Sequence, residues 1–182
     1  MHKKSKQTTL YNNYSDIILV KPTRRTKAAF IWIVKLLREE SILFRLSGGF
    51  AARIYGSRRK LADIDIGIYE RDIKRLLPKV KKYVIYGPKR YIDRNFNLLL
   101  MTLEYRGQVI DVYGNDKMKE YDCKNRKWLS YRPGLKNREI KRVYGLDVPI
   151  IPKKELIESK KRLGRRVDIE DVRQLEKHGQ NK

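Results

Sequence analysis

The chain has 182 residues, of which 44 are Lys or Arg and 21 are Asp or Glu, so its net charge is +23. Its length fits one compact domain with a small appendage, and its charge makes polyanions the first partners to consider. No apolar run approaches the roughly 18 residues that cross a bilayer, and the polar N-terminus lacks a signal-peptide core. The single cysteine and two histidines exclude an internal disulfide and a Cys/His zinc site, so we expect a cytoplasmic protein.

Helical and strand-like patterns alternate along the chain, which predicts an α/β fold. We expect residues 1–22 to be loosely ordered and residues 114–138, which lack periodicity, to mark a boundary. In chain order, the predicted elements are a helix over 28–40 capped by Thr26, a strand over 42–46, a turn at 47–49, a helical segment over 50–55, a strand over 62–68, a helix over 71–83 interrupted by Pro78, a strand pair over 98–104 and 108–113, and helices over 152–164 and 169–177.

Three acids stand in predicted strands. Asp63 and Asp65 alternate with isoleucines, so both project from one face, about 7 Å apart. Asp111 lies among β-branched residues in a second strand, and the three acids converge if the two strands are neighbours. Oxygen-only ligands select a hard cation, here Mg²⁺ or Mn²⁺. The alternatives are that Asp63 and Asp65 form a solvated face paired with basic residues, and that Asp111 is a buried acid bonded to an Arg or to amides.

A glycine turn, Ser47-Gly48-Gly49, precedes these acids. Glycines let the backbone approach phosphate oxygens, and amides at a following helix start favour an anion. Converging carboxylates that hold metal ions, together with such a turn, are what nucleotidyl transfer requires. The residues therefore predict that a nucleotide and a metal meet here.

The segment from Ser47 to Gly56, followed by Asp63-Ile64-Asp65-Ile66, resembles the signature of the DNA polymerase beta-like nucleotidyltransferase superfamily. Within it, the chain is most similar to the branch with the AbiEii-type toxins and the lincosamide and aminoglycoside nucleotidyltransferases. The resemblance covers residues 42–113 well and 155–175 more loosely. It implies a mixed sheet flanked by helices, with a catalytic core over 23–113 and a basic C-terminal region over 114–182 whose two helices complete the site.

The resemblance also implies roles for particular residues. Ser47, Gly48 and Gly49 would bind the nucleotide, Asp63 and Asp65 the metal, and Asp111, also a metal ligand, would help to activate the attacking hydroxyl. From the C-terminal helices, Lys160 would reach the triphosphate and Asp168 would orient it or the surrounding helices. Two simpler interpretations stay open: Lys160 on a solvated helix face, and Asp168 with Asp171 as a capping box.

Basic residues surround the predicted site. Arg53, Arg58 and Arg59 flank it and are suited to gripping phosphates. Farther along, aromatic residues alternate with cations in a pattern suited to stacking bases, although Trp128 packing beneath a long loop explains it as well. The predicted nucleic-acid contacts are Lys124, Arg126, Lys127, Trp128 and Arg132, with Tyr121 and Tyr131 beside them.

These observations predict a Mg²⁺-dependent enzyme that transfers a nucleoside monophosphate from a nucleoside triphosphate (NTP) to a hydroxyl and releases pyrophosphate. The charge favours RNA, such as a tRNA end, as acceptor over an aminoglycoside, since this surface would repel a polycation. The alternatives are a catalytically silent member that binds nucleic acid, and an enzyme acting on a small molecule or a protein hydroxyl. Which nucleotide is used, the biological role (a toxin among the candidates) and the oligomeric state stay open.

Overall fold

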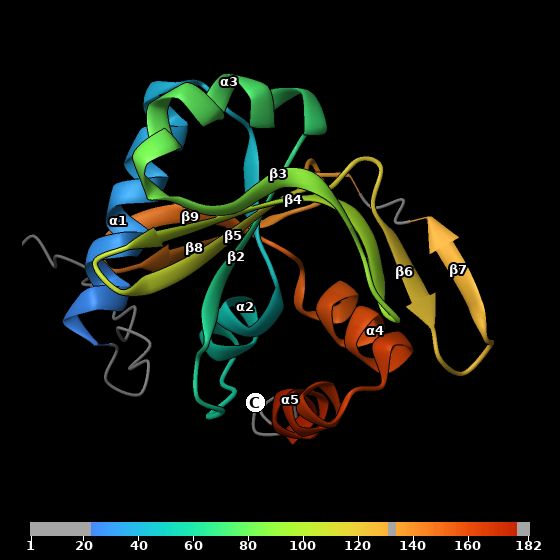
Figure 1. Ribbon diagram of the computed structural model, residues 1–182. Helices are drawn as coiled ribbons and strands as arrows, with labels where there is room; N and C mark the ends of the chain where they lie inside the picture. Colours follow the sequence, from blue (N-terminus) through green and yellow to red (C-terminus); the bar gives the residue numbers. More distant parts are fainter. Residues whose placement is uncertain (1–22, 131–133, 178–182) are drawn as a thin grey trace, which may run out of the picture.

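The computed structural model describes residues 23–130 and 134–177 (Figure 1). The segment 1–22, predicted to be loosely ordered, lies outside the described residues. The helices are α1 (Arg24–Glu39), α2 (Gly48–Ile54), α3 (Glu70–Val80), α4 (Lys153–Leu163) and α5 (Arg166–Lys177), with a 3-10 turn at Lys81–Tyr83. The strands are β1 (Phe44–Leu46), β2 (Asp63–Ile68), β3 (Val84–Ile92), β4 (Phe96–Tyr105), β5 (Gln108–Gly114), β6 (Lys119–Asp122), β7 (Lys127–Ser130), β8 (Glu139–Val143) and β9 (Leu146–Ile150).

These strands form one mixed sheet, in the order β7-β6-β4-β5-β2-β1-β9-β8, with β3 paired to the other edge of β4. The pairs β2 with β5 and β1 with β9 are parallel, and the other pairs are antiparallel. In Figure 1, α1 and α3 cover one face of the sheet, and α2, α4 and α5 lie on the other. The predicted mixed sheet flanked by helices is therefore confirmed.

Helix α1 begins one turn earlier than predicted. Its N-cap is Thr23, whose side chain accepts a hydrogen bond from the Thr26 amide at 3.2 Å. The predicted cap at Thr26 is therefore wrong: this residue is buried, and its hydroxyl donates to Gln108 Oε1 at 2.7 Å. The apolar residues that α1 buries against the sheet, at helical spacing, are Ala29, Phe30, Ile33, Val34 and Leu37.

Strand β2 has the predicted alternation. Ile64, Ile66 and Ile68 are fully buried in the main core, and burial of each contributes about 1.5–3 kcal/mol. Asp63 and Asp65 occupy the opposite face. Because a slip of one residue would exchange the two faces, this burial fixes the register of β2 and with it the position of both acids.

The predicted C-terminal helices are present, and Gly164 ends α4 in the left-handed conformation, with φ 62°, as expected of a helix C-cap. The strands β3, β8 and β9 were missed. Residues 114–138, predicted to be irregular, contain β6 and β7, and β6 pairs with β4 in the same sheet. Among the described residues, no helix is long and apolar enough to span a membrane.

Candidate active site

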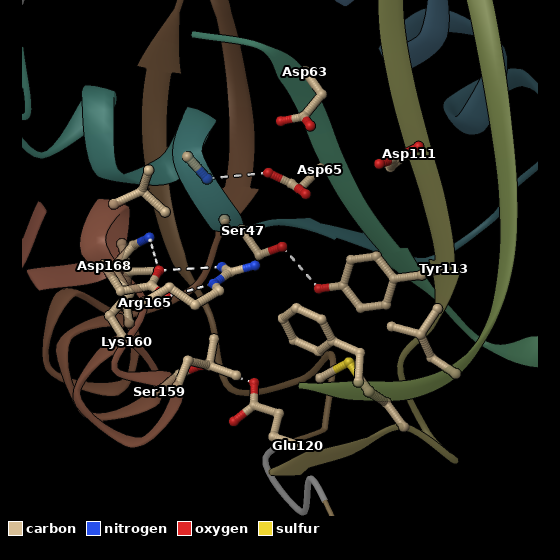
Figure 2. A pocket seen from close by; sticks show the side chains of 18 of the residues that line it. Ser47, Asp63, Asp65, Asp111, Tyr113, Glu120, Ser159, Lys160, Arg165 and Asp168 are labelled. Atoms are coloured by element: carbon tan, nitrogen blue, oxygen red, sulfur yellow. Dashed lines mark hydrogen bonds and ion pairs between the residues drawn. The ribbon is translucent and has the colours of Figure 1, made fainter. Parts of the chain in front are cut away.

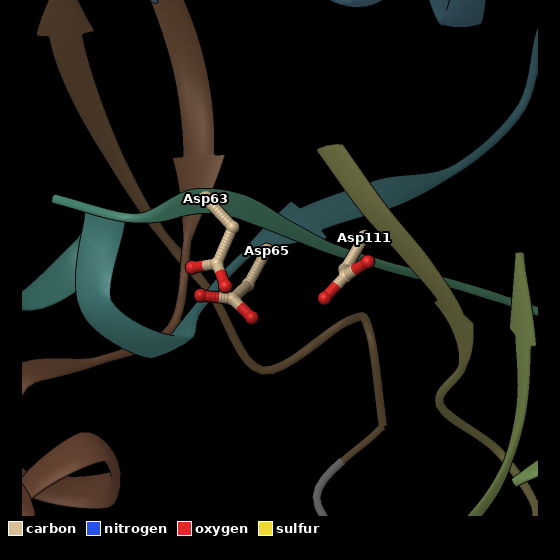
Figure 3. Close-up of side chains that lie close together, drawn as sticks. All are labelled: Asp63, Asp65 and Asp111. Atoms are coloured by element: carbon tan, nitrogen blue, oxygen red, sulfur yellow. The ribbon is translucent and has the colours of Figure 1, made fainter. Parts of the chain in front are cut away.

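Three carboxylates meet on the face of the sheet that carries α2. The parallel pairing of β2 with β5 sets Asp65 directly beside Asp111, and Asp63 precedes Asp65 on the same face. One carboxylate oxygen from each residue lies within 4.8 Å of the other two. Figure 3 shows the three side chains pointing to the same side of the sheet. This all-oxygen set fits a hard divalent cation such as Mg²⁺, as predicted from the sequence.

Burial and repulsion between carboxylates perturb two of these acids, Asp65 and Asp111. Burial and the charges of Asp63 and Asp111 raise the pKa of Asp65 to about 7, and the Gly49 amide and Lys160 only partly oppose the rise. Burial also raises the pKa of Asp111; a hydrogen bond from Thr102 Oγ1 at 2.7 Å counteracts this, while Asp63 adds to it. Such an arrangement is unfavourable without a cation and becomes favourable when one binds.

The glycine turn lies against Asp65. Gly48 begins α2 with φ +57°, and a Cβ at this position would stand 1.9 Å from Asp65 Oδ2. The Gly49 amide donates to the same oxygen at 3.0 Å. Ser47, the N-cap residue, makes no side-chain cap; its hydroxyl shares a hydrogen bond of 2.8 Å with the Tyr113 hydroxyl. Glycine is therefore required at 48 by both backbone conformation and space.

Two buried aspartates of α5 hold three cations beside the acids. Lys160 Nζ lies 3.0 Å from Asp168 Oδ1 and 2.8 Å from Asp171 Oδ2, and both carboxylates are fully buried. Arg165 pairs with Asp168 at 2.6 Å, and Arg59 pairs with Asp171 at 3.3 Å. Figure 2 shows Lys160, Arg165 and Asp168 together on one wall of the cavity. We call Arg59, Lys160 and Arg165 the cationic wall.

This arrangement corrects two of the simpler sequence interpretations. Asp168 lies within the first turn of α5 and pairs with Lys160, so it does not cap the helix. Lys160 is 4% exposed, so it is not on a solvated face. Although burial alone would raise the pKa of Asp171, hydrogen bonds from Lys160 and Ser57 hold it below its usual value.

The sequence analysis assigned Arg165 no role and considered Asp171 only as part of a capping box. The signal was present, because Arg165, Asp168 and Asp171 recur every three residues and so share one helix face. Of the arginines predicted to grip phosphates, Arg59 lines the cavity, whereas Arg53 and Arg58 are outside its lining. Arg53 donates instead to the backbone carbonyl of Arg59 at 2.6 Å.

The acids open into a cavity of about 410 Å³ between the sheet and α4. Its lining includes the three acids, the glycine turn and the cationic wall at one end, and apolar side chains at the other. Figure 2 shows Tyr113, Glu120 and Ser159 around the second end. The volume is within the range of small-ligand sites.

The predicted nucleic-acid residues that the structure describes lie outside this cavity, on the β6–β7 hairpin. Trp128 is 42% exposed, so it is not packed beneath a loop, and its ring contacts Tyr121 edge-to-face at 5.4 Å. Lys124, Arg126 and Lys127 are exposed around the hairpin turn. Arg132 and Tyr131 lie outside the described residues.

Comparison with known proteins was informative at the level of structure. No family model and no curated protein matches the sequence. A Thermotoga maritima protein described as a nucleotidyltransferase superposes with a TM-score of 0.68 at 15% identity, covering 84% of this chain and 93% of that one. The chain has the nucleotidyltransferase fold.

Two further structures with this fold are antibiotic-modifying proteins. A lincosamide antibiotic adenylyltransferase bound to lincomycin has a TM-score of 0.54 at 13% identity, covering 82% of this chain and 95% of that one. The resistance factor ANT(2'')-Ia, in complex with adenylyl-2''-tobramycin, has a TM-score of 0.54 at 14% identity, covering 85% of this chain and 92% of that one. At these identities the likeness is one of fold.

Proposed function

We propose that the protein is a metal-dependent nucleotidyltransferase, which transfers a nucleoside monophosphate from an NTP to a hydroxyl group and releases pyrophosphate. The observation that carries this proposal is the convergence of Asp63, Asp65 and Asp111 beside the glycine turn and opposite the cationic wall. A half-buried cluster of three acids has no evident role in packing, whereas it suits a cation and the charged substrate that a cation accompanies.

Asp63, Asp65 and Asp111 would hold Mg²⁺, which when bound supplies charge neutralisation for a triphosphate. The glycine turn lets the chain pack against Asp65 and hold its Oδ2 through the Gly49 amide. The cationic wall attracts the β- and γ-phosphates. An acceptor oxygen then attacks the α-phosphorus, forming an O–P bond while the bond to the pyrophosphate oxygen breaks. Asp111, which stands beside Asp65 in the paired strands, would accept the proton of the acceptor hydroxyl.

We further propose RNA as the acceptor. The net charge of +23 attracts a polyanion and repels polycationic drugs. The exposed Trp128, next to Tyr121, offers a base-stacking surface on the β6–β7 hairpin, which also carries exposed cations and the cavity residue Glu120. The antibiotic-bound structures of this fold favour a small-molecule hydroxyl as the second candidate.

A label-transfer assay tests both the nucleotidyl transfer and the RNA acceptor. The full chain is incubated with each α-labelled NTP, Mg²⁺ and total RNA, beside the Asp63→Ala/Asp65→Ala variant. We expect label on RNA with the wild type alone, and about 5-fold or greater loss of RNA affinity in Trp128→Ala, as expected when one stacking contact is removed. Transfer to a small-molecule hydroxyl but not to RNA would overturn the RNA acceptor. Absence of transfer to any hydroxyl, with equal RNA binding by both proteins, would favour a silent nucleic-acid-binding protein.

A further inference from the structure

Beyond the acids, part of the same cavity is lined by apolar side chains. We define the apolar chamber by Phe96, Leu98, Tyr113, Met118 and Leu156, which line the cavity. Leu98, Tyr113 and Met118 form a small cluster of their own, apart from the main core. These side chains therefore surround an open space next to the acids, and a flat apolar group would fill it.

A carboxylate stands at the end of this chamber. Glu120 is 4% exposed and lines the cavity beside the apolar side chains of the chamber. Ser159 Oγ donates to its Oε1 at 2.8 Å, and the Arg162 guanidinium donates to its Oε2 at 3.1 Å. Burial raises the pKa of the Glu120 carboxyl, and the hydrogen bond from Ser159 and the ion pair with Arg162 oppose that rise by favouring the ionised form. Each oxygen keeps a second lone pair for a ligand.

The chamber and the acids belong to one continuous space. Tyr113 lies between them in Figure 2, with its hydroxyl bonded to Ser47 of the glycine turn. On the opposite side, the Arg165 guanidinium lies 5.2 Å from the centre of the Phe96 ring, joining the cationic wall to the chamber. A ligand with a triphosphate at the acids would thus reach Glu120 with its other end.

Hydrogen-bond chemistry distinguishes the bases that such a carboxylate accepts. An ionised Glu is an acceptor only, so it pairs best with two adjacent N–H donors. Guanine presents this pair at N1–H and the N2 amino group. Adenine and cytosine place a ring-nitrogen acceptor beside their amino group, where it would face the second carboxylate oxygen. Uracil has a single N–H between two carbonyl acceptors.

We propose that the apolar chamber binds the base of a guanine nucleotide, with Glu120 accepting hydrogen bonds from guanine N1–H and the N2 amino group. This inference rests on the proposed function, because it assumes that the triphosphate lies at the acids and the cationic wall. Glu120 is then a specificity-determining residue, and GTP is the preferred donor substrate.

The test measures binding of non-hydrolysable analogues of the four NTPs, and of inorganic triphosphate, to the full chain with Mg²⁺ by calorimetry. We expect the GTP analogue to bind at least about fivefold more tightly than the other ligands, since a bidentate pair discriminates by roughly 1–3 kcal/mol. Glu120→Gln should lose this preference. The matched control is Glu158→Gln, the same chemical change at an exposed position of α4, which should keep it.

A second variant keeps the test independent of the folding of Glu120→Gln. Leu98→Trp fills the chamber, so it should lower the affinity for the GTP analogue to that of inorganic triphosphate without changing triphosphate binding. Equal affinity for all four analogues, or a guanine preference that survives in Glu120→Gln, would overturn the inference. If triphosphate binds but the four analogues have the same affinity, the inference about guanine fails while the proposed function stands. If neither triphosphate nor any analogue binds, the proposed function fails with it.

Discussion

The replacement Asp65→Asn should stabilise the metal-free protein while abolishing its activity. The rise in the pKa of Asp65 from 3.8 to about 7 corresponds to about 4 kcal/mol, at about 1.36 kcal/mol per pKa unit. Because water in the open cavity screens part of this repulsion, we expect a gain of about 2 kcal/mol near pH 8. For a chain of this size such a gain raises Tm by about 4–8 °C. The asparagine oxygen still accepts the Gly49 hydrogen bond, so the turn is preserved.

The pH dependence of this gain has a definite sign. The folded protein binds the Asp65 proton more tightly than the unfolded chain does, so the charge on Asp65 destabilises the fold increasingly as pH rises from about 4 to about 7. The advantage of Asp65→Asn over the wild type should therefore be small near pH 4 and largest above pH 7. Thermal melts of both proteins in EDTA, compared at each pH, measure it. A variant equally stable or less stable than the wild type at pH 8 would refute the repulsion inferred for this site.

Three other substitutions have expected outcomes. Lys160→Met leaves two buried aspartates without their shared cation, so it should lower the free energy of unfolding, measured in urea, by about 3 kcal/mol. We do not expect a larger loss, because each aspartate keeps its ion pair with an arginine. Gly48→Ala places a Cβ 1.9 Å from the present position of Asp65 Oδ2. Asp65 must then move, so kcat/KM should fall about 100-fold. Thr102→Val removes the hydrogen bond that opposes the raised pKa of Asp111, so the acid limb of the pH–rate profile should move to higher pH.

Each of these changes has a matched control in the chain. Lys161→Met, at a position 57% exposed, should alter stability by less than about 0.5 kcal/mol. Gly134→Ala meets no atom within 4 Å and should leave kcat/KM unchanged. Thr102→Ser keeps the hydroxyl and should keep the acid limb in place. An effect of similar size in the variant and its control would contradict the corresponding reasoning.

The acids were predictable from the sequence because their arrangement is largely local. The alternation of Asp63 and Asp65 with isoleucines sets the face of β2, and one strand of known period suffices to show it. The approach of Asp111 depends on the parallel pairing of β2 with β5, which joins segments more than 40 residues apart. From the sequence, we could say only that the three acids converge if the two strands are neighbours. The structure shows that β2 and β5 are paired.

The cationic wall shows where local patterns mislead. Asp168 and Asp171 have the spacing of a capping box, but the packing of α4 on α5 buries both beside Lys160, and ion pairing prevails over capping. The missed strands have a different cause. β3 contains Gly87-Pro88 and shifts its register against β4 at that point, and β7 and β8 are at the ends of the sheet with mostly polar, exposed residues. Strands of this kind lack the apolar alternation from which a strand is predicted.

The claim on which the proposed function most depends is that Asp63, Asp65 and Asp111 form a metal site. Mn²⁺ titration of the nucleotide-free protein, followed by electron paramagnetic resonance, tests it directly. We expect saturable Mn²⁺ binding by the wild type and its loss in Asp63→Asn/Asp65→Asn, while melting curves show the variant to be folded. Saturable binding that is equal in both proteins, or no binding by either, would contradict a metal site at these three residues.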